Sequence, residues 1–170
     1  MSYKQEFYNF NGDLDATKDV KKLKEVYLKV IDEFKAKKLE CLSIVNDETQ
    51  KKIIKQISEE LRVFETILFL GTGGSSLGGK TLYAIKNNLF INTNSPKVYF
   101  IENIDSEPIV ELLNNIDLKK TGIVVVSKSG ETIETLSQFF LIKDFSKNIV
   151  KDFSRNLYII TENKNSTLKR

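Results

Sequence analysis

The first third of the chain places apolar residues at helical spacing among charged ones. Between about residues 17 and 62 they recur every three or four positions, the spacing of one helix face. Asp47 followed three positions later by Gln50 is typical of a cap for the second of two helices. The pattern therefore predicts two amphipathic helices, with their apolar faces formed by Val20, Leu23, Tyr27, Val30, Ile31 and Phe34, then by Ile53, Ile54, Ile57 and Leu61.

A different pattern follows, in which short apolar runs alternate with helical spacing. Ser106 is expected to cap the middle one of three further helices, with Pro108 in its first turn. In the first of them, Leu77, Leu82 and Ile85 are expected to form the inner face. The predicted strands are residues 66–70, 97–101, 122–126 and 157–161, and the predicted helices are about 77–89, 107–115 and 132–145.

This alternation defines the expected fold. Strands and helices of these lengths predict βαβ crossovers and a mostly parallel sheet covered on both faces. We expect an α/β fold, a three-layer αβα sandwich with a doubly wound, flavodoxin-like sheet. Residues 1–62 would form a helical lead-in and residues 63–170 the α/β domain, all one structural unit. Ligands bind such sheets at the carboxyl ends of the strands, where residues 70–82 and 127–135 have unusual compositions.

Composition excludes several classes of function. The 26 basic and 23 acidic residues nearly cancel, so a net charge of +3 does not favour a nucleic-acid partner. The single cysteine, Cys41, cannot form an internal disulfide, and no N-terminal segment resembles a secretion signal. No apolar stretch approaches the length of a membrane span. We expect a cytoplasmic globular domain without membrane or nucleic-acid partners.

The stretch LGTGGSSLGGKTL, residues 70–82, holds five of the eight glycines. Read from Gly74, it matches GxxxxGK[ST], the pattern of a nucleotide-binding P-loop. However, the match begins about three residues after the apparent strand end, and only Glu102 could help to hold magnesium. Lys80 and Thr81 are more simply interpreted as first-turn residues of a helix. A Rossmann fingerprint fits less well, because Ser76 stands where glycine or alanine is needed.

The stretch SKSGETIET, residues 127–135, favours a phosphate site. Ser127, Ser129 and Thr132 supply hydroxyls and Lys128 an ammonium group at the start of a helix, whose free backbone N–H groups attract anions. Gly130 allows a tight turn under the anion. The alternative is that these residues only cap the helix.

Together the two stretches resemble a known family. GTGGSSLGG, followed about fifty residues later by SKSGETIET, is similar to the two signatures of the sugar-isomerase (SIS) domain in glucose-6-phosphate isomerases. In members of the family these signatures are roughly GxGGSxLG and SKTFTTxET or SKSGTTxE. IENIDSEPIVELL, residues 101–113, and LYIITENKNSTLKR, residues 157–170, also resemble family segments, so the likeness covers the chain from about residue 17.

The resemblance implies a site and an activity. It places the substrate phosphate on Ser127, Lys128, Ser129 and Thr132, and the sugar beside the loop positions Gly74 and Ser75. The ligand would be a small sugar phosphate, and the activity the interconversion of glucose 6-phosphate and fructose 6-phosphate. No metal or organic cofactor is expected, and a homodimer is, since family members usually pair. Glu131 departs from the isomerase pattern; in the helix's first turn it would interact with the helix dipole.

The resemblance does not supply a catalytic base. Family members have two such domains, and the glutamate base and an assisting histidine lie in the second. This chain has no histidine, and its glutamates at 102, 107, 131 and 134 do not occupy the base's position. Two hypotheses remain besides the P-loop NTPase: the N-terminal part of a glucose-6-phosphate isomerase, inactive by itself, or a stand-alone SIS module that binds a phosphosugar without catalysis.

Overall fold

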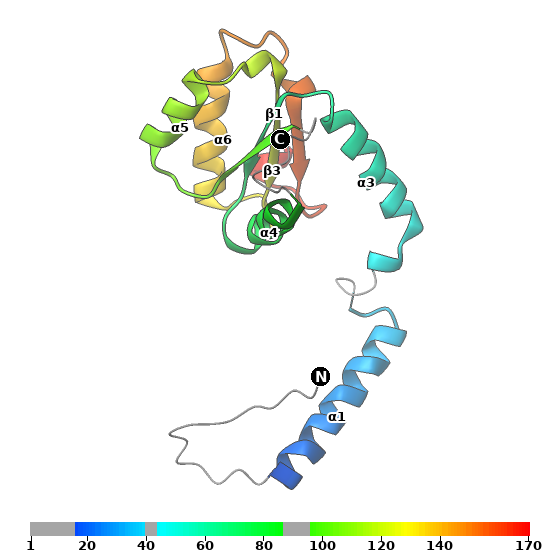
Figure 1. Ribbon diagram of the computed structural model, residues 1–170. Helices are drawn as coiled ribbons and strands as arrows, with labels where there is room; N and C mark the ends of the chain where they lie inside the picture. Colours follow the sequence, from blue (N-terminus) through cyan, green and yellow to red (C-terminus); the bar gives the residue numbers. More distant parts are fainter. Residues whose placement is uncertain (1–15, 40–43, 87–95) are drawn as a thin grey trace. The chain divides into compact units, whose positions relative to one another are not determined.

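A computed structural model describes residues 16–39, 44–86 and 96–170, and Figure 1 traces its helices and strands. By its internal contacts the chain forms two compact units, residues 1–54 and 55–170. The units are described separately below.

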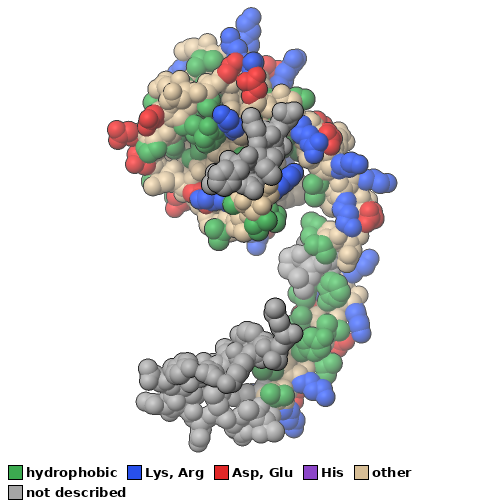
Figure 2. Space-filling view, viewed as in Figure 1, with side chains coloured by type: hydrophobic (Ala, Val, Ile, Leu, Met, Phe, Trp, Pro, Cys, Tyr) green, Lys and Arg blue, Asp and Glu red, His purple; other side chains and the backbone are tan. Residues whose placement is uncertain are grey.

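The first unit is helical. It contains α1 (Ala16–Lys35), a short 3-10 turn (Ile44–Asn46) and the beginning of α3 (Glu48–Leu61). Asp47 caps α3 as predicted, because its Oδ1 accepts hydrogen bonds from the backbone N–H groups of Thr49 at 2.9 Å and Gln50 at 3.1 Å. Apolar side chains lie uncovered along α1 (Figure 2), among them Leu23 and Tyr27. No helix among the described residues is both long and apolar enough to cross a membrane.

The second unit is built on a four-stranded parallel sheet in the order β2-β1-β3-β4. Leu70, at the end of β1, pairs with Ile101 on β2 and with Val125 on β3. The prediction of a mostly parallel, doubly wound α/β sheet is confirmed. The strands are β1 (Thr66–Leu70), β2 (Lys97–Ile101), β3 (Thr121–Val126) and β4 (Leu157–Ile160).

The crossover helices are α4 (Leu77–Lys86), α5 (Ser106–Asn114) and α6 (Ile133–Ser146), with 3-10 turns at Leu118–Lys120, Phe153–Asn156 and Thr167–Lys169. The end of the predicted helix 77–89 lies outside the described residues. In Figure 1, α5 and α6 lie next to each other on one side of the sheet. Their apolar faces bury the main core with alternate residues of β1 and β3 and with the last residue of β2; the core includes Leu68, Leu70, Ile101, Ile109, Leu113, Ile123, Val125, Phe139 and Ile142.

Helix α4 packs with a different face from the one predicted. Leu77, Leu82 and Ile85, the expected inner face, are 61%, 70% and 77% exposed. Instead, a Cβ on Gly79 would lie 3.6 Å from the ring of Phe100, and the hydroxyl of Tyr83 accepts the backbone N–H of Val98 at 3.2 Å. Glycine allows the helix to approach the sheet closely, and the tyrosine satisfies a backbone donor of the edge strand. The prediction failed because both advantages are invisible in a pattern of apolar residues.

The cap of α5 also differs from the prediction. Asp105, not Ser106, is the capping residue, and its carboxylate accepts the backbone N–H of Glu107 at 3.1 Å. The Asp105 backbone is extended, as a cap requires, whereas Ser106 already belongs to the helix. Pro108 remains in the first turn, where its missing N–H leaves no helical bond unmade.

Candidate functional site

The two glycine-containing loops meet at the point where the strand order reverses. From β1 the chain crosses to β2 at one edge of the sheet, whereas from β3 it crosses to β4 at the other. The loops that leave the adjacent strands β1 and β3 therefore begin side by side at the carboxyl edge. A Cβ on Gly71 would lie only 3.2 Å from the carbonyl oxygen of Val126. Such switch points are where open α/β sheets bind ligands.

The loop after β3 is closed by its own hydroxyl groups. Ser127 is only 1% exposed, and its Oγ lies 2.9 Å from Oγ1 of Thr132. The same Ser127 Oγ accepts the backbone N–H of Gly130 at 3.1 Å, and Ser129 Oγ accepts that of Glu131 at 3.1 Å. The structure thus brings the predicted serines and threonine into one turn. It also shows that two N–H groups expected to face an anion are already bonded to serine hydroxyls.

Thr132 occupies the N-cap position of α6 without capping it. Its backbone is extended, but its side chain makes no capping hydrogen bond, because the hydroxyl is directed to Ser127. The first hydrogen bond of the helix runs from Leu136 N–H to the Thr132 carbonyl at 2.9 Å. The preceding N–H groups of the first turn lack a cap from Thr132, and they carry the positive end of the helix dipole. Thr132 therefore does not cap α6 with its side chain, as the alternative interpretation of this stretch required.

Gly130 is required by the geometry of this loop. Its φ of +69° lies in the left-handed region, where side chains are strained. An added Cβ would also collide with the side chain of Ser166, approaching its Cβ to 2.6 Å. The glycine therefore lets the segment after β4 pack directly against the loop, as the hydrogen bond from Leu168 N–H to the Gly130 carbonyl at 3.3 Å confirms.

Lys128 is a solvent-exposed member of the candidate phosphate site. Its side chain is 87% exposed, and its ammonium nitrogen lies 3.7 Å from a carboxylate oxygen of Glu162. Lys164 also forms an ion pair with Glu162, and its hydrogen bond is the main cause that lowers the pKa of that carboxyl. An exposed and loosely paired ammonium group can move toward an incoming anion at little cost.

Glu131 has a role that the sequence analysis missed. It precedes the cap residue, and its carboxylate accepts the backbone N–H of Thr167 at 2.6 Å and the Thr167 hydroxyl at 2.8 Å. Both bonds hold the pKa of Glu131 below its ordinary value, and the bond from the Thr167 hydroxyl has the larger effect. Glu131 thus ties the segment after β4 to the loop after β3, a different role from the expected dipole interaction. The sequence signal for this contact was that both segments follow the ends of neighbouring strands.

The loop after β1 contains the predicted sugar-lining residues. Gly73–Ser75 form a 3-10 turn in which Gly73 has a φ of +54°, and Ser75 N–H donates to the Thr72 carbonyl at 3.1 Å. A Cβ added to Gly74 would meet no atom within 4 Å. The space beside Gly74 is therefore open to a ligand.

The P-loop interpretation fails on the positions of its own key residues. Lys80, which would reach the nucleotide phosphates, forms an ion pair with Glu102, which would help to hold magnesium. Glu102 also accepts the hydroxyl of Ser76 at 2.7 Å. Lys80 supplies the main effect that lowers the pKa of Glu102, with Ser76 second. The strand-end position of Glu102, beside the loop after β1, was the signal for this contact.

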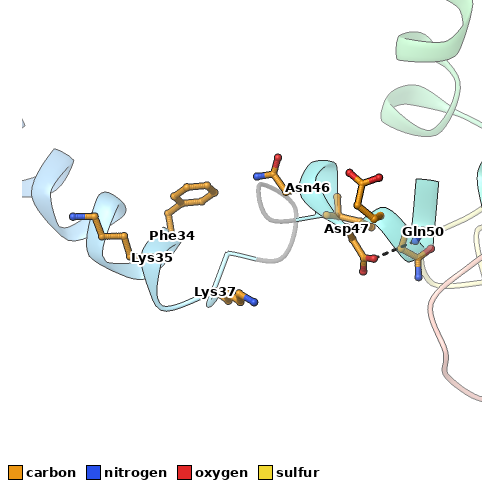
Figure 3. A pocket seen from close by; sticks show the side chains of 8 residues that line it. Phe34, Lys35, Lys37, Asn46, Asp47 and Gln50 are labelled. Carbon is orange, nitrogen blue, oxygen red and sulfur yellow. Dashed lines mark hydrogen bonds between the residues drawn. The ribbon is translucent and has the colours of Figure 1, made fainter. Parts of the chain in front are cut away.

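A pocket lies in the first unit (Figure 3). There, Asp47 and Gln50 are joined by the capping hydrogen bond of α3. The pocket contains none of the predicted site residues; it is lined by Phe34, Lys35, Lys37, Ile44, Asn46, Asp47, Glu48 and Gln50. Within the described ranges, no cluster of three or more His, Cys, Asp or Glu side chains could hold a metal ion.

The fold and the two loops define a parallel α/β domain with a candidate ligand site at its topological switch point. A family model described as phosphoglucose isomerase matches residues 43–167. The chain therefore belongs to the phosphoglucose isomerase family. This result confirms the resemblance found in the two sequence signatures.

Individual relatives agree with the family match. The chain is 36% identical to the probable glucose-6-phosphate isomerase of Methanococcus maripaludis, over 78% of this chain and 31% of that protein. It is 41% identical to the glucose-6-phosphate isomerase of Borreliella afzelii, over 62% of this chain and 20% of that protein. The chain therefore spans between a fifth and a third of the length of these relatives.

Solved structures share the fold. The crystal structure of a glucose-6-phosphate isomerase from Chlamydia trachomatis matches with a TM-score of 0.60 and 28% identity, over 71% of this chain and 23% of that one. A hypothetical protein from Thermus thermophilus matches with a TM-score of 0.72 and 24% identity, over 90% of this chain and 37% of that one. The latter likeness concerns the fold alone.

Proposed function

We propose that this chain is the N-terminal part of a glucose-6-phosphate isomerase and binds the phosphosugar at the switch point between β1 and β3. The whole enzyme interconverts glucose 6-phosphate and fructose 6-phosphate through an enediol, in glycolysis and gluconeogenesis. The observation that carries the proposal is the hydroxyl-lined turn from Ser127 to Thr132 at the start of α6. The family match supports the choice of substrate.

In this proposal the phosphate binds at the helix N-terminus. The hydroxyls of Ser127 and Thr132, already paired at 2.9 Å, both turn toward the anion and donate to its oxygens. Ser129 donates its hydroxyl hydrogen to the ligand in the same way, while its Oγ still accepts the N–H of Glu131. Lys128 swings from its 3.7 Å contact with Glu162 to neutralise charge. The dianion thereby gains hydrogen bonds and the field of the helix dipole.

The sugar ring then lies along the loop after β1. Gly74 leaves room because its Cα faces open space, so the backbone approaches the ring without a side chain between them. Ser75 offers a hydroxyl to the sugar. In this arrangement one loop recognises the phosphate and the other recognises the sugar, and the two strands hold them at a constant separation.

Proton transfer is assigned to no residue of this chain. A base must accept a carbon-bound proton, which a carboxylate does best when its pKa is near the working pH. The carboxyls of Glu102 and Glu131, which contact or belong to the two loops, instead have lowered pKa values because Lys80 and Thr167 bind them. We therefore place the base in the part of the enzyme that lies outside the match to this chain. Residues 63–170 form the SIS-type phosphosugar-binding domain of the proposed enzyme.

Calorimetric titration of the purified chain tests the proposal. Glucose 6-phosphate should bind more tightly than inorganic phosphate, and unphosphorylated glucose should bind more weakly than either. A coupled assay should detect no formation of fructose 6-phosphate. Absence of sugar-phosphate binding would contradict the proposed site, whereas measurable turnover would contradict the placement of the base. The homodimer and the cytoplasmic location stay predictions.

A further inference from the structure

The carboxylate of Glu102 joins the end of β2 to the loop after β1. Its Oε1 accepts the hydroxyl of Ser76 at 2.7 Å, and its Oε2 accepts a hydrogen bond from the ammonium group of Lys80. Ser76 is completely buried and Lys80 lies in the first turn of α4. One carboxylate therefore holds both the last residue of the loop and the start of the helix that follows it.

We propose that Glu102 is a positioning residue for sugar recognition, holding residues 73–76 in the orientation that presents Gly74 and Ser75 to the sugar. The inference rests on the proposed function and deepens it. It also gives Lys80 a purpose: the lysine that completes the P-loop pattern serves as the counterion of Glu102.

The contacts of Ser76 explain how this control reaches the loop. Ser76 Oγ lies 3.3 Å from the carbonyl oxygen of Gly73, and Ser76 N–H donates to the same carbonyl at 3.2 Å. The residue that Glu102 holds thus closes the turn containing Gly74 and Ser75. Without the carboxylate, a buried hydroxyl loses its strongest acceptor and Lys80 loses its counterion.

The loop after β3 is independent of this contact. Its hydroxyls bond to one another and to N–H groups within residues 127–132. Its outer contacts run to β4 and the segment after it, at Ile160, Glu162, Thr167 and Leu168. Loss of the Glu102 carboxylate should therefore impair recognition of the sugar and leave recognition of phosphate intact. A general loss of structure would impair both.

The experiment compares the affinities of glucose 6-phosphate and inorganic phosphate in variants of the full chain. In Glu102→Ala we expect the affinity for glucose 6-phosphate to fall about tenfold, the effect of one lost charged hydrogen bond, with less than about a twofold change for phosphate. Glu102→Gln keeps an acceptor for Ser76 and should recover part of the loss. Lys80→Met removes only the ion pair and should weaken sugar-phosphate binding less than Glu102→Ala.

A matched control exists at the amino-terminal ends of the strands, opposite the candidate site. Glu65 pairs with Lys120 at 2.7 Å, just before β1 and β3 begin. Glu65→Ala removes a comparable surface ion pair and should change neither affinity. Equal losses for both ligands in Glu102→Ala, or no loss for either, would overturn the inference while leaving the proposed function standing. If the unaltered chain bound no sugar phosphate, the proposed function would fail and the inference with it.

Discussion

Oγ of Ser127 and Oγ1 of Thr132 lie 2.9 Å apart, so the buried first residue of the loop after β3 and the N-cap residue of α6 share a hydrogen bond. This contact keeps the threonine hydroxyl away from the helix amides. The loop consequently presents a pair of hydroxyls beside an uncapped helix N-terminus. That relationship leads to the first prediction.

Thr132→Val should weaken binding of inorganic phosphate by at least about tenfold, because a hydrogen bond to a charged group contributes about 1.5 to 3 kcal/mol. The free energy of unfolding without ligand should fall by only about 1 kcal/mol, since one neutral hydrogen bond is lost. Calorimetric titration and urea unfolding measure the two effects.

Thr81→Val is the matched control for that substitution. Its hydroxyl donates to the Leu77 carbonyl within α4 at 2.8 Å. The variant should bind phosphate as the unaltered chain does. A loss of phosphate binding in Thr81→Val but not in Thr132→Val would contradict the site and return the P-loop hypothesis.

Gly130→Ala should destabilise the second unit by about 2 to 5 kcal/mol, the sum of left-handed strain and overpacking. The φ of +69° and the collision with Ser166 are the causes. Urea unfolding followed by circular dichroism measures the change. Gly78→Ala, in helix α4 with open space around it, should instead stabilise by about 0.5 to 1 kcal/mol. Equal stability of the two variants would disprove the packing of Ser166 on Gly130.

Gly74→Ala tests the sugar-facing loop. The added methyl group meets no protein atom within 4 Å, so the free energy of unfolding should change by less than about 0.5 kcal/mol. The affinity for glucose 6-phosphate should nevertheless fall, while that for inorganic phosphate should stay the same, because the methyl group occupies space left for the ring. Calorimetric titration with each ligand measures this. Unchanged sugar-phosphate binding would contradict the placement of the sugar beside Gly74.

Glu131 should make part of the stability depend on pH. Its bonds from Thr167 keep the pKa of its carboxyl below the ordinary 4.5 in the folded chain. A carboxyl with a depressed folded pKa contributes stability above its unfolded pKa and loses it as the pH falls through the folded value. The difference in unfolding free energy between the unaltered chain and Glu131→Gln should therefore be constant near neutrality and shrink in acid.

Urea unfolding from about pH 7 down to about pH 3 spans that window. Glu111→Gln, a change at an exposed site on α5, controls for the loss of one negative charge. A difference for Glu131→Gln that is the same at both ends of the range would contradict the role of the ionised carboxylate.

The predictions from periodicity agree closely with the structure, and those from individual side chains less so. The strands at 66–70 and 97–101 match their predicted bounds, and α6 differs from its prediction by one residue at each end. The run at 66–70 marks β1 correctly because that strand lies between β2 and β3 and is buried on both faces, which favours a continuous apolar run. Periodicity failed for α4, where Gly79 and Tyr83 face the sheet and Leu82 faces outward. The close approach of the helix to the sheet at Gly79 and the hydrogen bond of Tyr83 decided which face of α4 packs, rather than apolar character.

The amino-acid sequence by itself determined the succession of strands and helices along the chain, the two loop signatures and the family. These features depend on local patterns of burial and turn chemistry. The contacts of Lys80 with Glu102 and of Glu131 with Thr167 join residues 22 and 36 positions apart. Nothing local determines them, because each needs two strand ends brought together by the order of strands in the sheet. Only the tertiary structure could show that the lysine of a nucleotide-loop pattern is bound to a carboxylate, and that the loop after β3 is tied to the segment after β4.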